Sequence, residues 1–162
     1  MTVAVNTILH QYGALPFLIT GQREIRILLV NTRGRRTWII PKGWPIRKLT
    51  PAATATREAY EEAGVLGTVV GDEPFGSYCY EKPGNGRNLA VYEVHVFLFA
   101  VQRQLRKWPE RSERETRWFA PAEAATLVAP AGLADIVRTA TSQLLVEPAV
   151  WRNASLSASH KA

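Results

Sequence analysis

The segment between Thr50 and Gly64 constrains the fold most, because both ends of a helix can be read from it. Thr50 is a residue type that caps helix N-termini, and Pro51 fits the first helical position. Gly64 is a typical C-terminal stop. These signals predict a helix over Pro51–Ala63, about three and a half turns long.

The predicted helix has two contrasting faces. At about 100° per residue, the side chains of Glu58, Glu61 and Glu62 share one arc. The other side carries small or apolar residues: Ala52, Ala53, Thr56, Ala59, Tyr60 and Ala63. Small side chains let a helix lie close to its neighbour, so this side is predicted to pack on a sheet.

Strand patterns lie on both sides of this helix. Apolar alternation and turn residues predict the following strands: 11–20, 23–31, 37–40, 67–80, 88–102 and 116–119. Two more helices are predicted at 121–128 and 133–145. This order indicates an α+β fold with layers of helix, sheet and helix. The 162 residues suit one domain over 1–150, followed by a polar, mobile tail over 151–162.

The composition is that of a basic protein, with a net charge of +6 and a pI of about 9.8. This charge fits either simple solubility or an anionic partner, such as a phosphate-rich small molecule. Nucleic acid is disfavoured because the basic residues form no long run. The only cysteine, Cys79, cannot form an internal disulfide, and no stretch approaches the roughly 20 apolar residues of a membrane span. A cytoplasmic protein without membrane association is therefore expected.

The three helix glutamates repel one another unless something neutralises them. Arg57 can pair with Glu61 four residues on, but one arginine does not balance three acids. A divalent cation would, and Mg²⁺ is usually held by a few carboxylates together with substrate phosphates. The alternative is a solvated acidic face without a ligand.

The wider spacing around these acids distinguishes the two interpretations. The pattern G-x5-E-x7-R-E-U-x-E-E-x-G-U, with U apolar, is matched by Gly43, Arg57, Glu58, Glu61, Glu62, Gly64 and Val65. This pattern resembles the signature of the Nudix hydrolases. Leu49 stands where the signature has its first glutamate, and Ala59 fills its first apolar position. The flanks "WIIPKGW" and "TRWF" with "PAEA" are most similar to the branch that hydrolyses diphosphoinositol polyphosphates and diadenosine polyphosphates.

The resemblance implies a Nudix-type α/β/α sandwich with a mixed sheet and a catalytic loop-helix. It also implies a hydrolase that depends on Mg²⁺ or Mn²⁺ and cleaves a diphosphate linkage in a dinucleoside polyphosphate or an inositol pyrophosphate. The metal ligands would be Glu58, Glu61, Glu62 and the Gly43 carbonyl. Arg57 would orient one of the glutamates, and the resemblance leaves the general base unassigned.

Further residues are candidates for binding the substrate. Positive charge that could meet phosphates comes from Arg36, Lys42, Lys82 and Arg87, although each also reads as an ordinary surface residue. Trp44 either stacks on a base or packs in the core. The resemblance also implies an extra acid from the loop before the tryptophan strand, where Glu113 is chosen over Glu110 and Glu115. The alternative is an ordinary solvated, charged loop.

Two other functions stay open. Leu49 would suit a Nudix-fold module that binds a nucleotide without turnover. The basic pI permits a Nudix enzyme acting on RNA 5′ ends, and the oligomeric state is undetermined. The three histidines, at positions 10, 95 and 160, have no metal-site spacing along the chain, so no site is predicted at them.

Overall fold

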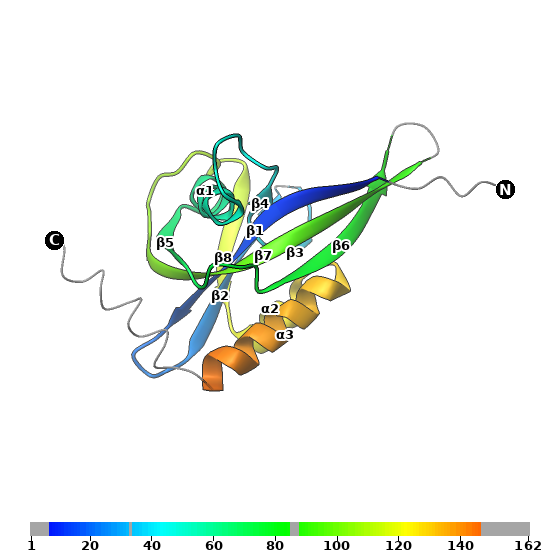
Figure 1. Cartoon of the computed structure of the whole chain (residues 1–162). Helices are drawn as coiled ribbons and strands as arrows, with labels where there is room; N and C mark the ends of the chain where they lie inside the picture. The colour runs from blue at the N-terminus through cyan, green and yellow to red at the C-terminus, as the bar shows by residue number, and fades with distance from the viewer. Residues whose placement is uncertain (1–6, 33, 85–87, 147–162) are drawn as a thin grey trace.

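The computed structural model describes residues 7–32, 34–84 and 88–146. Within these residues, one mixed sheet lies between helix α1 on one face and helices α2 and α3 on the other (Figure 1). The strands are β1 (Ile8–Ile19), β2 (Ile25–Thr32), β3 (Trp38–Ile39), β4 (Lys42–Gly43), β5 (Val65–Val69), β6 (Gly76–Pro83), β7 (Leu89–Gln104) and β8 (Arg114–Phe119). The helices are α1 (Pro51–Ala63), α2 (Pro121–Leu127) and α3 (Ala131–Val146). The predicted α+β fold in three layers is confirmed, while the predicted tail at 151–162 lies outside the described residues.

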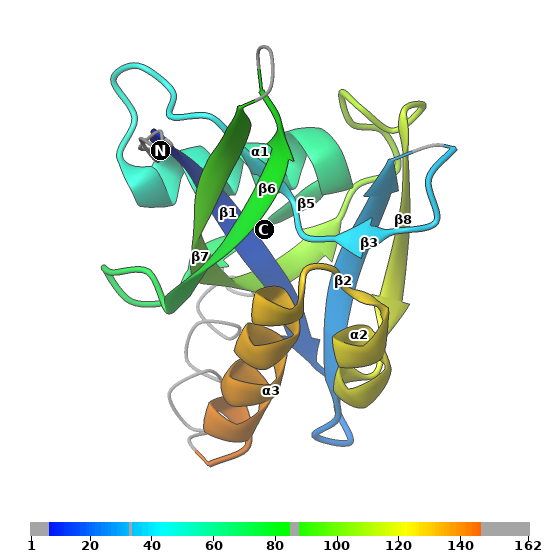
Figure 2. The same cartoon turned by 90° about the vertical axis from the view of Figure 1, so that its right-hand side faces the viewer.

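The sheet is organised around one parallel pair. Strands β1 and β7 run in parallel, in register from Ile8 opposite Val91 to Phe17 opposite Ala100. The order across the sheet is β3-β2-β1-β7-β5, with β4 joined to β1, β6 to β7 and β8 to β2 (Figure 2). Those remaining pairings are antiparallel. Residues far apart in the sequence therefore meet along the β1–β7 pair.

Each face of the sheet has its own apolar core. Helix α1 packs on one face through Ala55, Ala59 and Ala63, which are fully buried against Phe97 and Phe99. The absence of longer side chains on this side of α1 brings the helix close to the strands. On the other face, α2 and α3 bury a larger cluster, and each large apolar side chain fully buried there contributes about 1.5–3 kcal/mol.

Both predicted ends of α1 are confirmed. The Thr50 hydroxyl accepts a hydrogen bond from the Ala53 amide at 3.1 Å, as an N-cap does. Gly64 has a φ of 65°, a left-handed conformation, and its amide donates to the Tyr60 carbonyl at 3.0 Å. The acidic turns of the helix are thus placed by signals within a few residues of them.

The single strand predicted at 67–80 is wrong, since the chain forms two strands there. Both β5 and β6 run along the same edge of β7, and the chain leaves that edge between them. The Val70 amide still donates to Leu98 and the Phe75 amide to Val96 on β7, so the excursion is short. Gly71 supplies the reason, because it adopts a φ of 78° that a strand residue does not take.

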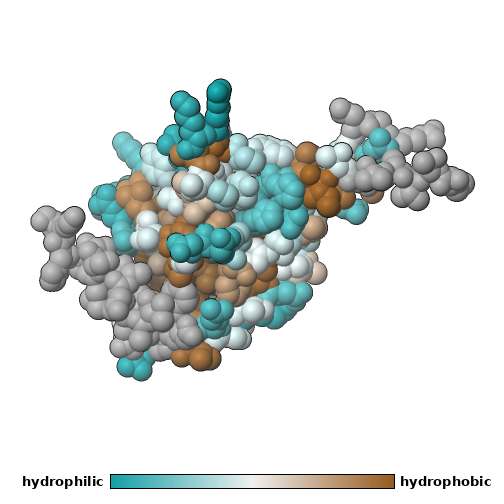
Figure 3. Space-filling view, viewed as in Figure 1, coloured by the Kyte–Doolittle hydropathy of each residue, from teal (hydrophilic) through white to brown (hydrophobic). Residues whose placement is uncertain are grey.

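The surface mixes polar and apolar residues. In the orientation of Figure 1, hydrophobic groups are scattered among hydrophilic ones rather than joined in one patch (Figure 3). Of the helices in the described ranges, none combines the length and the apolar character needed to span a bilayer.

Candidate active site

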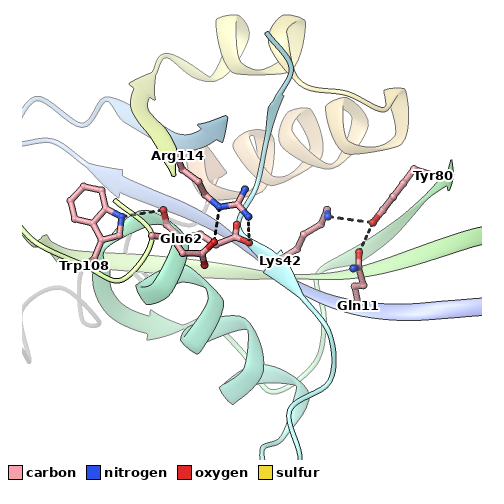
Figure 4. A network of polar contacts seen from close by, with 7 residues as sticks. Gln11, Lys42, Glu62, Tyr80, Trp108 and Arg114 are labelled. Atoms are coloured by element: carbon pink, nitrogen blue, oxygen red, sulfur yellow. Dashed lines mark hydrogen bonds and ion pairs between the residues drawn. The ribbon is translucent and has the colours of Figure 1, made fainter. Parts of the chain in front are cut away.

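Glu62 is the most buried acid of the glutamate helix. Its side chain is 5% exposed, and Arg114 of strand β8 lies against it. Glu58 and Glu61, predicted to share one arc with Glu62, are only partly buried, so the three acids differ in exposure. Arg114 Nη2 lies 3.0 Å from Glu62 Oε1, and Arg114 Nε lies 3.3 Å from Glu110 Oε1 (Figure 4).

The acids hold more negative charge than this arginine neutralises. The pKa of Glu62 is raised to about 8, chiefly by burial; Arg114 and Lys42 oppose the rise, and the nearby Glu58 and Glu110 add to it. The pKa of Glu58 is raised too, by burial first and then by Glu61 and Glu110. Without another cation, Glu62 is protonated at neutral pH.

The residues present fit a divalent metal ion. Glu62 Oε2 is buried and has no hydrogen-bond partner among the described residues. Such an oxygen is costly to leave unpaired, and a cation supplies what it lacks. The surroundings of the Glu62 carboxylate therefore fit those of a ligand to Mg²⁺ or Mn²⁺.

Gly43 is required by the position of Glu58. A Cβ atom at residue 43 would collide with the Glu58 carboxylate, so only glycine leaves room for it. Strand β4 carries Gly43 and pairs with β1 through Tyr12 and Gly13. The loop and the helix of the predicted motif are thereby in direct contact.

Glu61 lies on the more exposed side of the cluster. Arg57 Nε donates to Glu61 Oε1 at 2.7 Å, which confirms the pair predicted from their spacing. This contact raises the pKa of Arg57, and the side chain of Glu61 is 31% exposed. In the ranges that the structure describes, the three helix acids do not form a group of ligand atoms within 4.8 Å of one another. Rotation of Glu61 would be needed for all three to hold one ion.

The loop between β7 and β8 clamps the end of α1. Trp108 Nε1 donates to the Glu62 carbonyl at 3.2 Å, and the Glu110 amide donates to the Glu61 carbonyl at 3.0 Å. The Trp108 ring lies where a side chain on Gly64 would be. These contacts hold the acidic turn against the loop (Figure 4).

The same loop corrects the choice of extra acid. Glu113 is exposed, whereas Glu110 pairs with Arg114 and shifts the pKa of both Glu58 and Glu62. The structure thus favours Glu110 over Glu113. Sequence reasoning also missed Arg114, because no local pattern links it to a helix some fifty residues earlier.

A pocket of about 400 Å³ opens beside Glu62. Its lining includes four cationic side chains: Arg35, Lys42, Lys82 and Arg114. Lys42 Nζ donates to the Tyr80 hydroxyl at 3.3 Å, and that hydroxyl donates to Gln11 at 2.6 Å (Figure 4). Burial lowers the pKa of Lys42, against the opposing effect of Glu62. The pocket has an acidic wall, formed by Glu62, and several cationic side chains. A phosphate-bearing ligand next to a metal ion would require both.

The tyrosines that line the pocket, Tyr78 and Tyr80, come from β6. The ring of Tyr80 stacks on that of Tyr92 with centroids 5.0 Å apart, and Lys82 lies over both rings. Burial raises the pKa of Tyr78, whose hydroxyl is buried without a hydrogen-bond partner in the described part of the chain. Trp44 is half exposed and leans on Tyr92 at 5.6 Å, so it is not a core residue.

Only some of the predicted basic residues line the pocket. Lys42 and Lys82 line the pocket. Arg36, which was predicted to meet the phosphates, lines a neighbouring depression instead. The adjacent Arg35 lines the pocket. Arg87 falls outside the described residues. Leu49, at the variant position of the motif, is 42% exposed.

Comparisons with known proteins identify the family of the chain. A family model described as NUDIX domain matches residues 9–140. Nudix hydrolase 12, mitochondrial, of Arabidopsis thaliana is 32% identical over 107 residues, covering 64% of this chain and 52% of that protein. Diphosphoinositol polyphosphate phosphohydrolase 3-alpha of Mus musculus is 31% identical over 110 residues, covering 61% and 57%. The chain thus spans about half the length of the curated relatives it matches.

Solved structures share the fold. The crystal structure of a C. elegans Ap4A hydrolase binary complex has a TM-score of 0.63 and 16% sequence identity, covering 85% of this chain and 98% of that one. At this level of identity the likeness concerns the fold alone.

Proposed function

This chain belongs to the Nudix family, and on that premise we propose that it is a metal-dependent hydrolase of a diphosphate linkage. The observation that carries the proposal is the environment of the Glu62 carboxylate, in which only one of the two oxygens has a partner in the described ranges. One carboxylate oxygen is held by Arg114, and the other is buried without a hydrogen-bond partner in the described ranges. A buried acid of this kind favours a cation beside it.

The metal ion would be held by Glu58 and Glu62, with Glu61 and the Gly43 carbonyl as further ligands. When bound, such an ion withdraws charge from a phosphoryl group and lowers the pKa of coordinated water. The pKa of Glu62 is raised to about 8 even with Arg114 beside it, so binding of the ion would be linked to loss of the Glu62 proton.

The side chains around the acids have separate roles. Lys42 and Lys82 are proposed to bind phosphate oxygens, because both line the pocket beside Glu62. Arg57 is proposed to orient Glu61 through their 2.7 Å contact. Arg114 bridges Glu62 and Glu110 and also lines the pocket, so it couples the acidic wall to a bound substrate.

The proposed substrate is a dinucleoside polyphosphate or an inositol pyrophosphate. Four cationic side chains around one pocket suit several phosphates better than one. The names of the mouse relative and of the C. elegans structure point to the same two substrate classes. The stacked pair Tyr80 and Tyr92 offers an aromatic surface for a base at the same wall.

The test is a hydrolysis screen over nucleoside triphosphates, diadenosine polyphosphates, ADP-sugars, inositol pyrophosphates and capped RNA, each with Mg²⁺ and with EDTA. We expect Mg²⁺-dependent product release with the polyphosphates. Glu62→Gln should lower kcat by roughly 10² or more, because the amide loses the ligand charge with little change of shape. The matched control is Glu123→Gln, the same change at an exposed residue of α2. Undiminished turnover in EDTA, or equal rates in both variants, would refute the proposal.

A second candidate is a binding module that holds a nucleotide without cleaving it. Leu49 favours it, because an exposed leucine occupies the position where the family signature has a glutamate. Tight nucleotide binding without product release under any condition of the same screen would support this alternative.

A further inference from the structure

Two of the histidines meet on the sheet, although no sequence spacing links them. His10 lies on β1 and His95 on β7, and the parallel pairing brings His10 Nδ1 to 3.0 Å from His95 Nε2. Glu93 is the register partner of His10, and its Oε2 lies 3.7 Å from His10 Nδ1. The spacing of the histidines along the chain, on which no site was predicted, does not reveal that His10 and His95 lie close together in the fold.

This group lies on the opposite side of the sheet from the pocket. Side chains alternate along a strand, so Gln11 reaches Tyr80 at the pocket wall while the adjacent His10 points to the other face. Ser77 and His95 are register partners on β6 and β7, so their side chains share that face too. In Figure 1 the outer parts of β1, β6 and β7 run beyond helix α1. The proposed hydrolase activity makes no use of these residues.

We propose that His10, Glu93 and His95 form a binding site for a zinc-type transition-metal ion, separate from the glutamate helix. Each residue offers one ligand atom, and the three atoms lie within 4.8 Å of one another. Ligands about 2.0–2.1 Å from a tetrahedral zinc ion are about 3.3 Å apart. The observed spacings of 3.0 and 3.7 Å fall on either side of that value.

The donor set selects the class of metal. Imidazole nitrogens suit Zn²⁺, Cu²⁺ and Ni²⁺, whereas Mg²⁺ prefers oxygen ligands. Two histidines with one carboxylate leave a fourth position for water. The site on the glutamate helix is all oxygen, so the two sites would take different ions.

The surroundings hold the ligands in place. All three residues lie in the central parallel strand pair, where the backbone positions are fixed by the sheet. Ser77 Oγ donates to Glu93 Oε1 at 3.0 Å, which orients the carboxylate as outer partners of metal ligands do. His95 is also packed between two rings, with His10 at 5.2 Å and Tyr12 at 5.7 Å between centroids.

The experiment is calorimetric titration of the full chain with Zn²⁺ in excess Mg²⁺, so that the glutamate site is already occupied. Visible absorption with Co²⁺ provides a second readout, since nitrogen ligands give it a distinct spectrum. We expect one Zn²⁺ per chain, with the affinity reduced at least about 100-fold by His95→Gln. That loss exceeds the 10–100-fold effect of outer partners, and Ser77→Ala should reduce affinity by roughly tenfold.

Two variants serve as controls, and one guards against misfolding. His160→Gln makes the same change outside the described residues and should bind Zn²⁺ as the wild type does. Glu62→Gln should also leave Zn²⁺ affinity unchanged. His10→Gln repeats the test at a side chain that is half exposed, where a fold defect is not expected.

Three outcomes would overturn the proposal. The first is that the wild type binds no Zn²⁺, and the second is that His10→Gln and His95→Gln bind Zn²⁺ with the affinity of the wild type. The third is that binding is lost only in Cys79→Ser. The last outcome would place the ion on the exposed thiol that faces Glu93 across β6 and β7.

Discussion

Replacing Glu62 by glutamine should stabilise the metal-free protein at alkaline pH. The pKa of Glu62 is about 8 in the fold against an ordinary value of 4.5, and burial is the main cause. Between these values the folded state binds more protons than the unfolded chain. The free energy of unfolding therefore falls as pH rises through this window. Glutamine resembles the protonated acid in shape and does not ionise, so the variant lacks this loss.

The size of the effect follows from the two pKa values. One pKa unit corresponds to about 1.36 kcal/mol, so the full shift of about 3.5 units would be worth up to about 5 kcal/mol. Between pH 6 and pH 8 alone, the wild type should lose roughly 2 kcal/mol relative to Glu62→Gln. Well below pH 4.5 the two proteins should be close in stability, because Glu62 is then neutral in both states.

Urea unfolding of both proteins in EDTA, followed by fluorescence from pH 5 to pH 9, measures this difference. Glu123→Gln is the matched control, since the same change at an exposed acid should give no pH-dependent difference. Adding Mg²⁺ should reverse the order at pH 8, because only the wild type gains from binding the ion. If the wild type is the more stable protein at pH 8 in EDTA, the ion pair with Arg114 outweighs burial, and the reasoning fails.

Three further substitutions test the site. Gly43→Ala should lower kcat by about tenfold or more, because the new methyl group displaces the Glu58 carboxylate, whereas Gly21→Ala meets open space and should leave the rate unchanged. Arg57→Ala should lower kcat by roughly tenfold through lost orientation of Glu61, and Arg138→Ala, which removes an exposed pair on α3, should not; equal rates would make the Arg57 pair a surface contact. Lys42→Ala should reduce kcat/KM for substrates with four or more phosphates by about tenfold or more, and the preference of the wild type for these substrates should weaken as the salt concentration rises. If the variant loses as much activity on ATP as on a diadenosine polyphosphate, Lys42 does not distinguish substrates by their number of phosphates.

Features set by neighbouring residues could be predicted from the sequence. The ends of α1 depend on Thr50 and Gly64, and the pair Arg57 and Glu61 depends on helical spacing, so all are local. The burial of Glu62 is different, because it depends on how the β7–β8 loop covers the helix. Wheel geometry places Glu62 with its neighbours, but only packing distinguishes it from them.

The other features that the sequence did not predict depend on contacts between distant residues or on the path of a loop. His10 and His95 meet through a parallel strand pair, which no turn in the sequence reveals. Glu110, rather than Glu113, faces the acids because the chain turns twice within a few residues of loop. Gly71 marks the interruption between β5 and β6, yet the apolar residues around it continue as one pattern.

The clamp on helix α1 makes the acidic turn and the β7–β8 loop one cooperative unit of folding. Four carbonyls at the end of the helix, from Glu61 to Gly64, accept hydrogen bonds from the segment 104–110. Opening that segment would leave these carbonyls without protein partners, so the last turn of the helix would unravel with it. Amide hydrogen exchange in that turn therefore reports on the loop as much as on the helix. A ligand that orders Glu61 and Glu62 would therefore also slow amide exchange along the rest of the loop.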